Sequence, residues 1–171
     1  MPLIVTPGAP DADSFVSLET ADRYHLNRGS EIWAAAEEFA REAALRRASA
    51  YLSSSFSWRG VRTHRRGQSL AWPRAGVTDS EGDALPSDAI PAEIVSATCE
   101  IAAVELANPG AMSPSIDLTQ RVKRERVDVL ETEYFAAAAG DVRPVLPMVA
   151  DLIGGLLSSR SNTLVGSVLR S

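Results

Sequence analysis

The stretch PAEIVSATCEIAAVELAN, residues 91–108, is the most informative about the fold. Drawn as a helix, it is apolar around most of its circumference, so other elements would have to cover it on several sides. Pro91 suits a first helical turn, where its missing N–H costs nothing, and the following Pro109-Gly110 is a typical end. The pattern therefore predicts a central helix over residues 91–108.

Two more helices are predicted before this one. Ser17 is a typical N-cap, Glu19 places a negative charge in the first turn, and Gly29 is a typical end. An alanine-rich stripe at three- and four-residue spacing predicts a longer second helix over residues 31–52. The stripe consists of Trp33, Ala36, Phe39 or Ala40, Ala43, Ala44, Arg47, Ala48 and Tyr51. We expect another helix to approach this stripe closely, because its side chains are mostly small.

The segments around the central helix have other patterns. Residues 56–90 are rich in Gly and Pro and predict a long loop. Residues 116–135 alternate with a period of two, which predicts an extended, β-like hairpin segment carrying mixed charges. Pro144 begins a last helix, which ends at Gly154-Gly155.

Length and composition indicate a single domain. Of the 171 residues, 45% are apolar and 23% charged, which are ordinary values for a globular protein. We predict a mainly α domain at residues 17–155, a small bundle of about four helices, with flexible arms at residues 1–16 and 156–171. The net charge of −5 is unusual for a dedicated nucleic-acid-binding protein. Any contact with DNA would therefore come from a local patch.

The sequence carries no recognised catalytic or metal-binding motif. It has no GxSxG, HExxH, phosphate-loop or GxGxxG pattern, and its single cysteine, Cys99, cannot form an internal disulfide. The two histidines, His25 and His64, have no metal-ligand spacing. The N-terminus lacks a signal-peptide pattern, and no apolar run is long enough to span a membrane. We therefore expect a protein made in the cytoplasm, without enzymatic activity, cofactor, metal or membrane partner.

The stretch RTHRRGQSLAWPRAGV, residues 62–77, permits two interpretations. It is either a contact for nucleic acid or a neighbouring subunit, or a surface loop with a charged rim that is held against the helices. The first interpretation takes charge from Arg59, Arg62, Arg65 and Arg66 and stacking faces from Trp58 and Trp72. The second takes its anchor from Trp58, Leu70, Trp72 and Pro73. We favour the anchor, because about four arginines in an acidic protein would bind DNA weakly and in a salt-sensitive way.

The C-terminal stretch LLSSRSNTLVGSVLRS, residues 156–171, is polar but contains two apolar pairs, Leu164-Val165 and Val168-Leu169. Such pairs are typical of a segment that becomes ordered on a partner. A frayed terminus with chance apolar residues is the alternative, and the residues alone leave both open.

Several short motifs resemble one known family. They are SLETADRY at 17–24, EAALRRASAYL at 42–52, WRGVRT at 58–63, QSLAWPRAGV at 68–77 and IPAEIVSAT at 90–98. In this order they resemble a family of small tailed-phage proteins, often labelled DnaT-like single-stranded-DNA-binding proteins, which look like head–tail connectors (adaptors or head-completion proteins). Similar proteins occur in gene transfer agents. The resemblance covers roughly residues 14–110, and the remainder matches only in outline.

The resemblance implies a structural virion protein. Such connectors form a twelve-fold ring on the portal, extend the DNA channel, and carry a stopper or tail-terminator protein at the virion neck. Double-stranded DNA would pass through the channel without sequence-specific binding. The tail, residues 156–171, would dock into the portal through Leu164, Val165, Val168 and Leu169, with Arg160 and Arg170 as polar partners. The alternative is a single-stranded-DNA-binding protein linked to phage replication.

Overall fold

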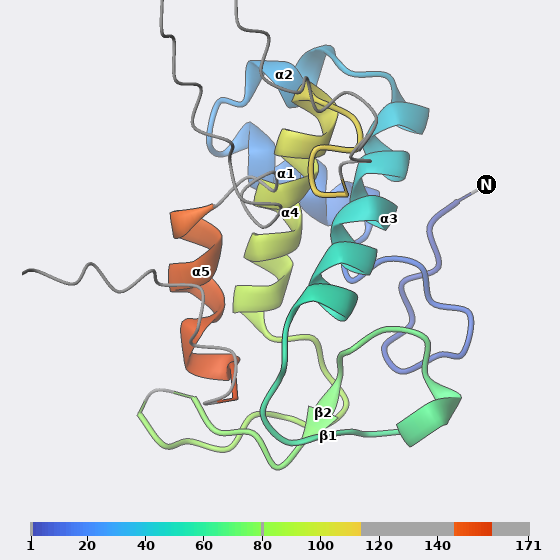
Figure 1. Ribbon diagram of the computed structural model, residues 1–171. Coiled ribbons are helices and arrows are strands. Elements are labelled where there is room, and N and C mark those ends of the chain that lie inside the picture. Colours follow the sequence, from blue (N-terminus) through green and yellow to red (C-terminus); the bar gives the residue numbers. More distant parts are fainter. Residues whose placement is uncertain (1, 80, 114–145, 159–171) are drawn as a thin grey trace, which may run out of the picture.

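The computed structural model describes residues 2–79, 81–113 and 146–158, and within them the chain is a small helical bundle (Figure 1). The α-helices are α1 (Leu18–Leu26), α2 (Glu31–Ala35), α3 (Glu38–Ser55), α4 (Ala92–Ala107) and α5 (Pro147–Ile153). The shorter elements are β1 (Val61–Arg62), η1 (Arg65–Gly67), β2 (Arg74–Ala75) and η3 (Gly154–Leu156). The predicted mainly α bundle with a long loop is confirmed. The predicted extended segment, residues 116–135, lies outside the described residues.

Helix α4 is central, as the apolar stretch at 91–108 predicts. It contacts α1, α2, α3 and α5, and Figure 1 shows it between α3 and α5. Ile94, Ala97, Ile101 and Ala102 on α4 are fully buried. Since apolar side chains lie around most of this helix, every neighbouring helix can bury its own apolar face against it.

The contact between α3 and α4 is the most extensive one between any two elements of the described structure. Its buried face carries Ala44, Leu45, Ala48 and Leu52, none of which has measurable exposure. Two of these four are alanines, so the two backbones can come close, and the leucines fill the space at either side. Burying such a set stabilises the fold by several kcal/mol, at roughly 25 cal/mol per Å² of apolar surface.

The single helix predicted over residues 31–52 is wrong in one respect, because it is broken into α2 and α3. Ala36 and Glu37 have extended backbones, with ψ of 143° and 148°. The break changes the helical phase, so the predicted alanine stripe does not form one continuous face. Trp33 turns into the core from α2, whereas Phe39 in the first turn of α3 is 75% exposed. Helix α3 also continues past the predicted end, through Ser55.

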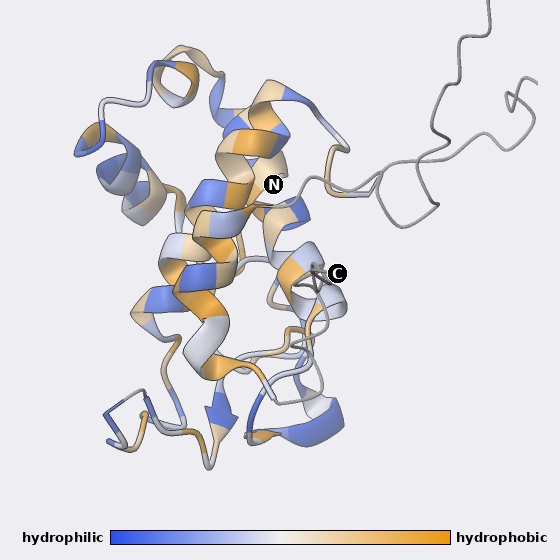
Figure 2. Cartoon of the chain, turned by 60° about the vertical axis from the view of Figure 1, so that its left-hand side comes forward, coloured by the Kyte–Doolittle hydropathy of each residue, from blue (hydrophilic) through white to orange (hydrophobic). Residues whose placement is uncertain are grey.

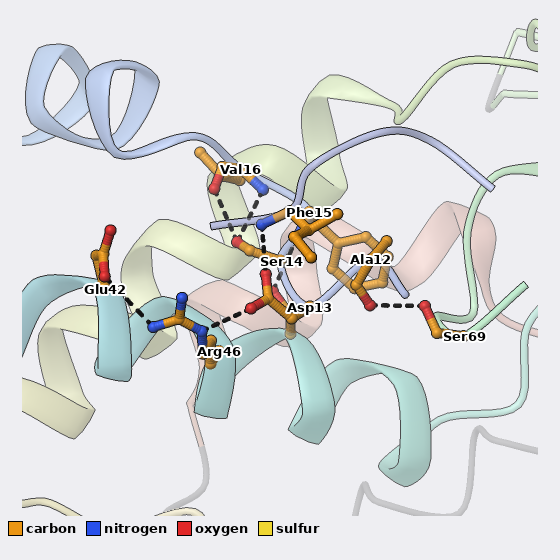
Figure 3. A network of polar contacts seen from close by, with 10 residues as sticks. Ala12, Asp13, Ser14, Phe15, Val16, Glu42, Arg46 and Ser69 are labelled. Atoms are coloured by element: carbon orange, nitrogen blue, oxygen red, sulfur yellow. Dashed lines mark hydrogen bonds and ion pairs between the residues drawn. The ribbon is translucent and has the colours of Figure 1, made fainter. Parts of the chain in front are cut away.

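Residues 2–16, the described part of the predicted N-terminal arm, contain no helix or strand, but the last of them belong to the core. Phe15 and Val16 are buried, and the Phe15 backbone N–H donates to Ser49 Oγ on α3 at 3.0 Å. Arg46 Nε on α3 donates to Asp13 Oδ2 at 2.6 Å (Figure 3). These contacts hold the segment along α3, and the hydrogen bond to the Asp13 carboxylate raises the pKa of Arg46.

A buried carboxylate closes the far end of α4. Glu105, 1% exposed, accepts hydrogen bonds from the Gly110 N–H at 2.8 Å, the Met112 N–H at 3.0 Å and Arg47 Nε at 2.6 Å. Burial alone would raise the pKa of Glu105, but the two backbone N–H groups and Arg47 together lower it. One carboxylate therefore joins α3, α4 and the turn that follows α4.

The substitution Glu105→Gln should destabilise the fold by about 2–3 kcal/mol, because it leaves Arg47 without its partner and one backbone N–H without a charged acceptor. The pKa of Glu105 is lower in the folded than in the unfolded chain, so its contribution is present above about pH 4 and is lost as the pH falls through the folded value. In urea unfolding between pH 7 and about pH 3, the free energy of unfolding should fall less steeply with decreasing pH in the variant than in the wild type.

Glu93→Gln is the matched control, since Glu93 lies on the same helix and makes no ion pair within the described residues. It should leave the free energy of unfolding within about 0.5 kcal/mol of wild type. Equal stability and equal acid sensitivity of wild type and Glu105→Gln would contradict the role given to this carboxylate.

Candidate nucleic-acid interface

The long loop between α3 and α4 lies at the end of the bundle opposite α2 (Figure 1). Inside it, β1 and β2 pair antiparallel, with Val61 opposite Ala75 and Arg62 opposite Arg74. A bridge between Trp58 and Leu157 joins the start of the loop to the chain just after η3. The loop is thus a short hairpin with the 3-10 turn η1 between its strands. Figure 2 shows hydrophilic segments at this end of the molecule.

Four apolar side chains hold this loop against the helices. Trp58 and Leu70 are 8% and 9% exposed, Trp72 is 1% exposed, and Pro73 is buried. The two indole rings meet edge to face, with centroids 5.8 Å apart and planes at 78°. Since both rings are buried in the core, neither presents a free face on which a base could stack. The stacking role that the nucleic-acid interpretation gives to Trp58 and Trp72 is therefore wrong.

Arg74 organises the hairpin from inside, a role that the sequence interpretation missed. Its guanidinium donates to the backbone carbonyls of Arg59 at 2.6 Å, Gly60 at 2.7 Å and Ala71 at 3.1 Å. Burial, and then the nearby charge of Arg62, lower the pKa of Arg74. The sequence does contain a signal for this role. Arg74 directly follows Trp72-Pro73, which is predicted to be buried, so its backbone must lie close to the core.

Two further positions fix the path of the loop. The Gln68 side chain, 3% exposed, donates to the carbonyls of Leu70 and Pro73 at 2.9 and 3.1 Å. Gly60 has a φ of +64°, and a Cβ there would collide with the carbonyl oxygen of Ala75. Position 68 therefore requires the hydrogen-bonding side chain of Gln68, and position 60 requires the conformational freedom of Gly60.

The arginines proposed as contacts remain at the outside of this loop. Arg65 and Arg66, in η1, are exposed, Arg62 is half-buried, and none of the three forms an ion pair within the described residues. Arg59 is exposed and donates from Nε to the Leu157 carbonyl at 3.1 Å. We call Arg62, Arg65 and Arg66 the basic knuckle. It is a compact positive patch on an acidic protein.

The backbone of Arg65 is unusual. Its φ of +54° is in the left-handed region, and among the described residues no other non-glycine residue has a positive φ. An L-residue in this region costs roughly 1 kcal/mol relative to glycine. The surrounding loop therefore holds Arg65 at the tip in a backbone conformation that an L-residue disfavours.

The other predicted sites have different outcomes. The proposed portal-docking residues, Leu164, Val165, Val168, Leu169, Arg160 and Arg170, lie outside the described residues. Across residues 2–79, 81–113 and 146–158, no group of three or more His, Cys, Asp or Glu side chains could hold a metal ion. In the same part of the chain, no helix is long and apolar enough to cross a membrane.

Comparison with known proteins identifies a family. A family model described as "Putative DnaT-like ssDNA binding protein" matches residues 1–171, the whole chain. No curated protein and no solved structure matches the chain. The family match supports the label that the sequence motifs resemble, and it does not extend to the connector interpretation.

The substitution Arg74→Lys should loosen the loop, because a single ammonium group cannot serve carbonyls that a planar guanidinium reaches together. We expect a loss of about 1–3 kcal/mol in unfolding free energy and faster proteolytic cleavage between residues 56 and 90. Arg62→Lys, the residue paired with Arg74 across the hairpin, is the matched control and should change neither quantity. Equal cleavage rates for the two variants would show that Arg74 does not organise the loop.

Proposed function

The chain belongs to the family of DnaT-like ssDNA-binding proteins, and from this premise we propose that it binds single-stranded DNA through the basic knuckle. The observation that carries the proposal is that Arg62, Arg65 and Arg66 gather at one loop tip without a carboxylate partner in the described residues. Arginines left unpaired by the protein are free to pair with phosphate oxygens.

The knuckle suits contact with the sugar–phosphate backbone and not with bases. Trp58 and Trp72, the tryptophans nearest to it in sequence, are buried, so base stacking by these two rings contributes nothing. Three arginines can neutralise about three phosphates, which gives weak binding without sequence preference. Such binding keeps a strand close without fixing its register. The proposal includes no catalytic step, metal or cofactor.

A second candidate function is the head–tail connector of a tailed phage or gene transfer agent. The favouring observation is that the motifs WRGVRT and QSLAWPRAGV form the buried anchor and hairpin of the loop, which is a structural role. In this candidate the protein forms a ring on the portal at the virion neck, extends the DNA channel and carries the stopper or tail-terminator protein. The knuckle would then contact a neighbouring subunit, and residues 156–171 would dock into the portal.

Replacing Arg62, Arg65 and Arg66 together by Gln should weaken oligonucleotide binding by at least about tenfold at low salt. For the wild type, the logarithm of the binding constant should fall with the logarithm of the salt concentration at a slope of about −2, since each phosphate contact contributes about −0.7. Fluorescence anisotropy with a labelled oligonucleotide of mixed sequence measures both. Arg23→Gln, an exposed arginine on α1 without an ion pair in the described residues, should bind as wild type.

The substitution Arg65→Gly separates binding from stability. It relieves the left-handed backbone at this position, so the melting temperature should stay equal or rise, by an amount that corresponds to at most about 1 kcal/mol. Oligonucleotide binding should nevertheless weaken, because one of the three charges is lost. Thermal unfolding and anisotropy on the same sample give the two values. Unchanged DNA binding in this variant would remove Arg65 from the site.

The connector candidate is tested with isolated portal rings and electron microscopy. Full-length wild type should decorate the rings if the candidate is correct, and the full chain with Leu164→Asp and Leu169→Asp should not. Decoration of the rings by the wild type, with no binding of oligonucleotides, would favour the connector over the single-strand binder. Binding of oligonucleotides, with no decoration of the portal rings, would favour the single-strand binder over the connector.

A further inference from the structure

A mostly apolar pocket of about 560 Å³ lies between α1, α2 and the first turn of α3. Figure 1 shows α2 at the opposite end of the bundle from the hairpin of β1 and β2. The rings of His25 and Trp33 line it and stack on each other, with centroids 4.1 Å apart and planes at 23°. Asp22 fixes one side, because it accepts from Trp33 Nε1 and from Arg41 Nη1, both at 2.7 Å. The pocket therefore has a defined wall of packed side chains.

The elements around this pocket carry large apolar side chains that are exposed to solvent. The described residues include five exposed large apolar side chains, and three of them lie on the elements that surround the pocket. These are Leu26, Ile32 and Phe39, at 80%, 44% and 75% exposure. Buried side-chain atoms here, His25 Nε2 and Arg41 Nε, also have no hydrogen-bond partner within the described residues. An apolar patch of this kind is typical of a surface that another segment covers.

The exposed charges on the elements around the pocket are mostly acidic, and Arg23 is the exposed cation that lines it. Glu31 begins α2, and Glu37 and Glu38 lie at the junction with α3. All three are exposed, and none has an ion pair within the described residues. A segment that fits this surface is apolar, to enter the pocket, and carries positive charge beside its apolar residues.

The C-terminal end of this chain has that chemistry. Residues 159–171, SRSNTLVGSVLRS, contain four large aliphatic side chains, two arginines and no acidic side chain. Leu164-Val165 and Val168-Leu169 would enter the pocket and cover its apolar rim, while Arg160 and Arg170 would face the glutamates. We propose that the pocket binds residues 159–171 of a second copy of the chain.

The distance along the fold selects a second copy over the same copy. The described chain ends at Ser158, whose N–H donates to the Ser57 carbonyl, just beyond the C-terminal end of α3. The pocket is at the other end of α3, which at about 1.5 Å per residue is about 27 Å long. Six residues, from Ser158 to Leu164, span at most about 22 Å. Leu164 therefore falls short of its own pocket, and a tail in the same copy could place only Val168-Leu169 there, whereas the tail of another copy can place both apolar pairs.

Sedimentation velocity of the full chain over a range from about 1 to 500 µM tests the proposal, since a small interface of this kind binds in the micromolar range. The pocket variant is Ala34→Arg, because Ala34 is exposed and lines the pocket, so a long cation there blocks it and repels Arg160 and Arg170. The tail variant is Leu164→Asp with Leu169→Asp. Ala50→Arg, an exposed alanine in the second half of α3, is the matched control for the pocket variant.

The wild type and Ala50→Arg should associate equally, and the pocket and tail variants alone should associate at least about tenfold more weakly, a change of about 1.4 kcal/mol. An equimolar mixture of the two variants should recover association, because one copy retains a normal tail and the other a normal pocket. A wild type that stays monomeric, a variant that associates as wild type does, or a mixture that does not recover would each overturn the proposal.

A labelled peptide of residues 159–171 gives a second measurement that depends less on the folding of any variant. It should bind the full-length tail variant, whose pocket is free, and should bind Ala34→Arg at least about tenfold more weakly. Circular dichroism and thermal unfolding establish that both variants are folded. Equal peptide binding by the two would overturn the proposal. Neither experiment uses DNA, so its failure leaves the proposed function untouched.

Discussion

The packing of α3 on α4 is the contact on which the other parts of the structure depend. Ala44 and Ala48 bring the two helices close, and Ile94 and Ile101 fill the same buried core from the side of α4. A pair of helices with this much apolar surface in common forms a stable platform for the loops. Helices α1, α2 and α5 pack on α4, and the N-terminal segment and the loop each bond to α3.

Single polar side chains hold those non-helical segments. Ser49 and Ser53, one turn apart on α3, accept backbone N–H groups from Phe15 in the N-terminal segment and from Ala71 in the loop. Glu105 does the same for the turn after α4, and Arg74 serves the carbonyls of the hairpin. Each partner is a backbone group that would be costly to bury alone. The irregular half of the protein is therefore fixed by a few hydrogen-bonding side chains as much as by apolar packing.

This arrangement separates two surfaces of opposite character. One end of the bundle presents the basic knuckle, and the other presents the apolar pocket with the exposed Glu31, Glu37 and Glu38 on its elements. Helix α3 spans the distance between them. A nucleic-acid contact at one end and a protein contact at the other would not compete for space, so copies of the protein could associate while each contacts DNA. The two proposals are compatible for that reason, although different residues carry them.

The sequence by itself determined the helical class and the central helix, because apolar periodicity at 91–108 reflects burial directly, and it located the long loop through its glycines and prolines. Tertiary structure decided the rest. The break at Ala36-Glu37 exposes Phe39, and neither residue is a typical helix breaker. In the loop, the sequence favours the tryptophans as anchors without excluding them as stacking faces, and it does not separate an arginine that binds phosphate from one that bonds to backbone carbonyls. Which role each takes depends on what lies beside it in space, so only the fold turned Trp58, Trp72 and Arg74 inward and left the knuckle outside.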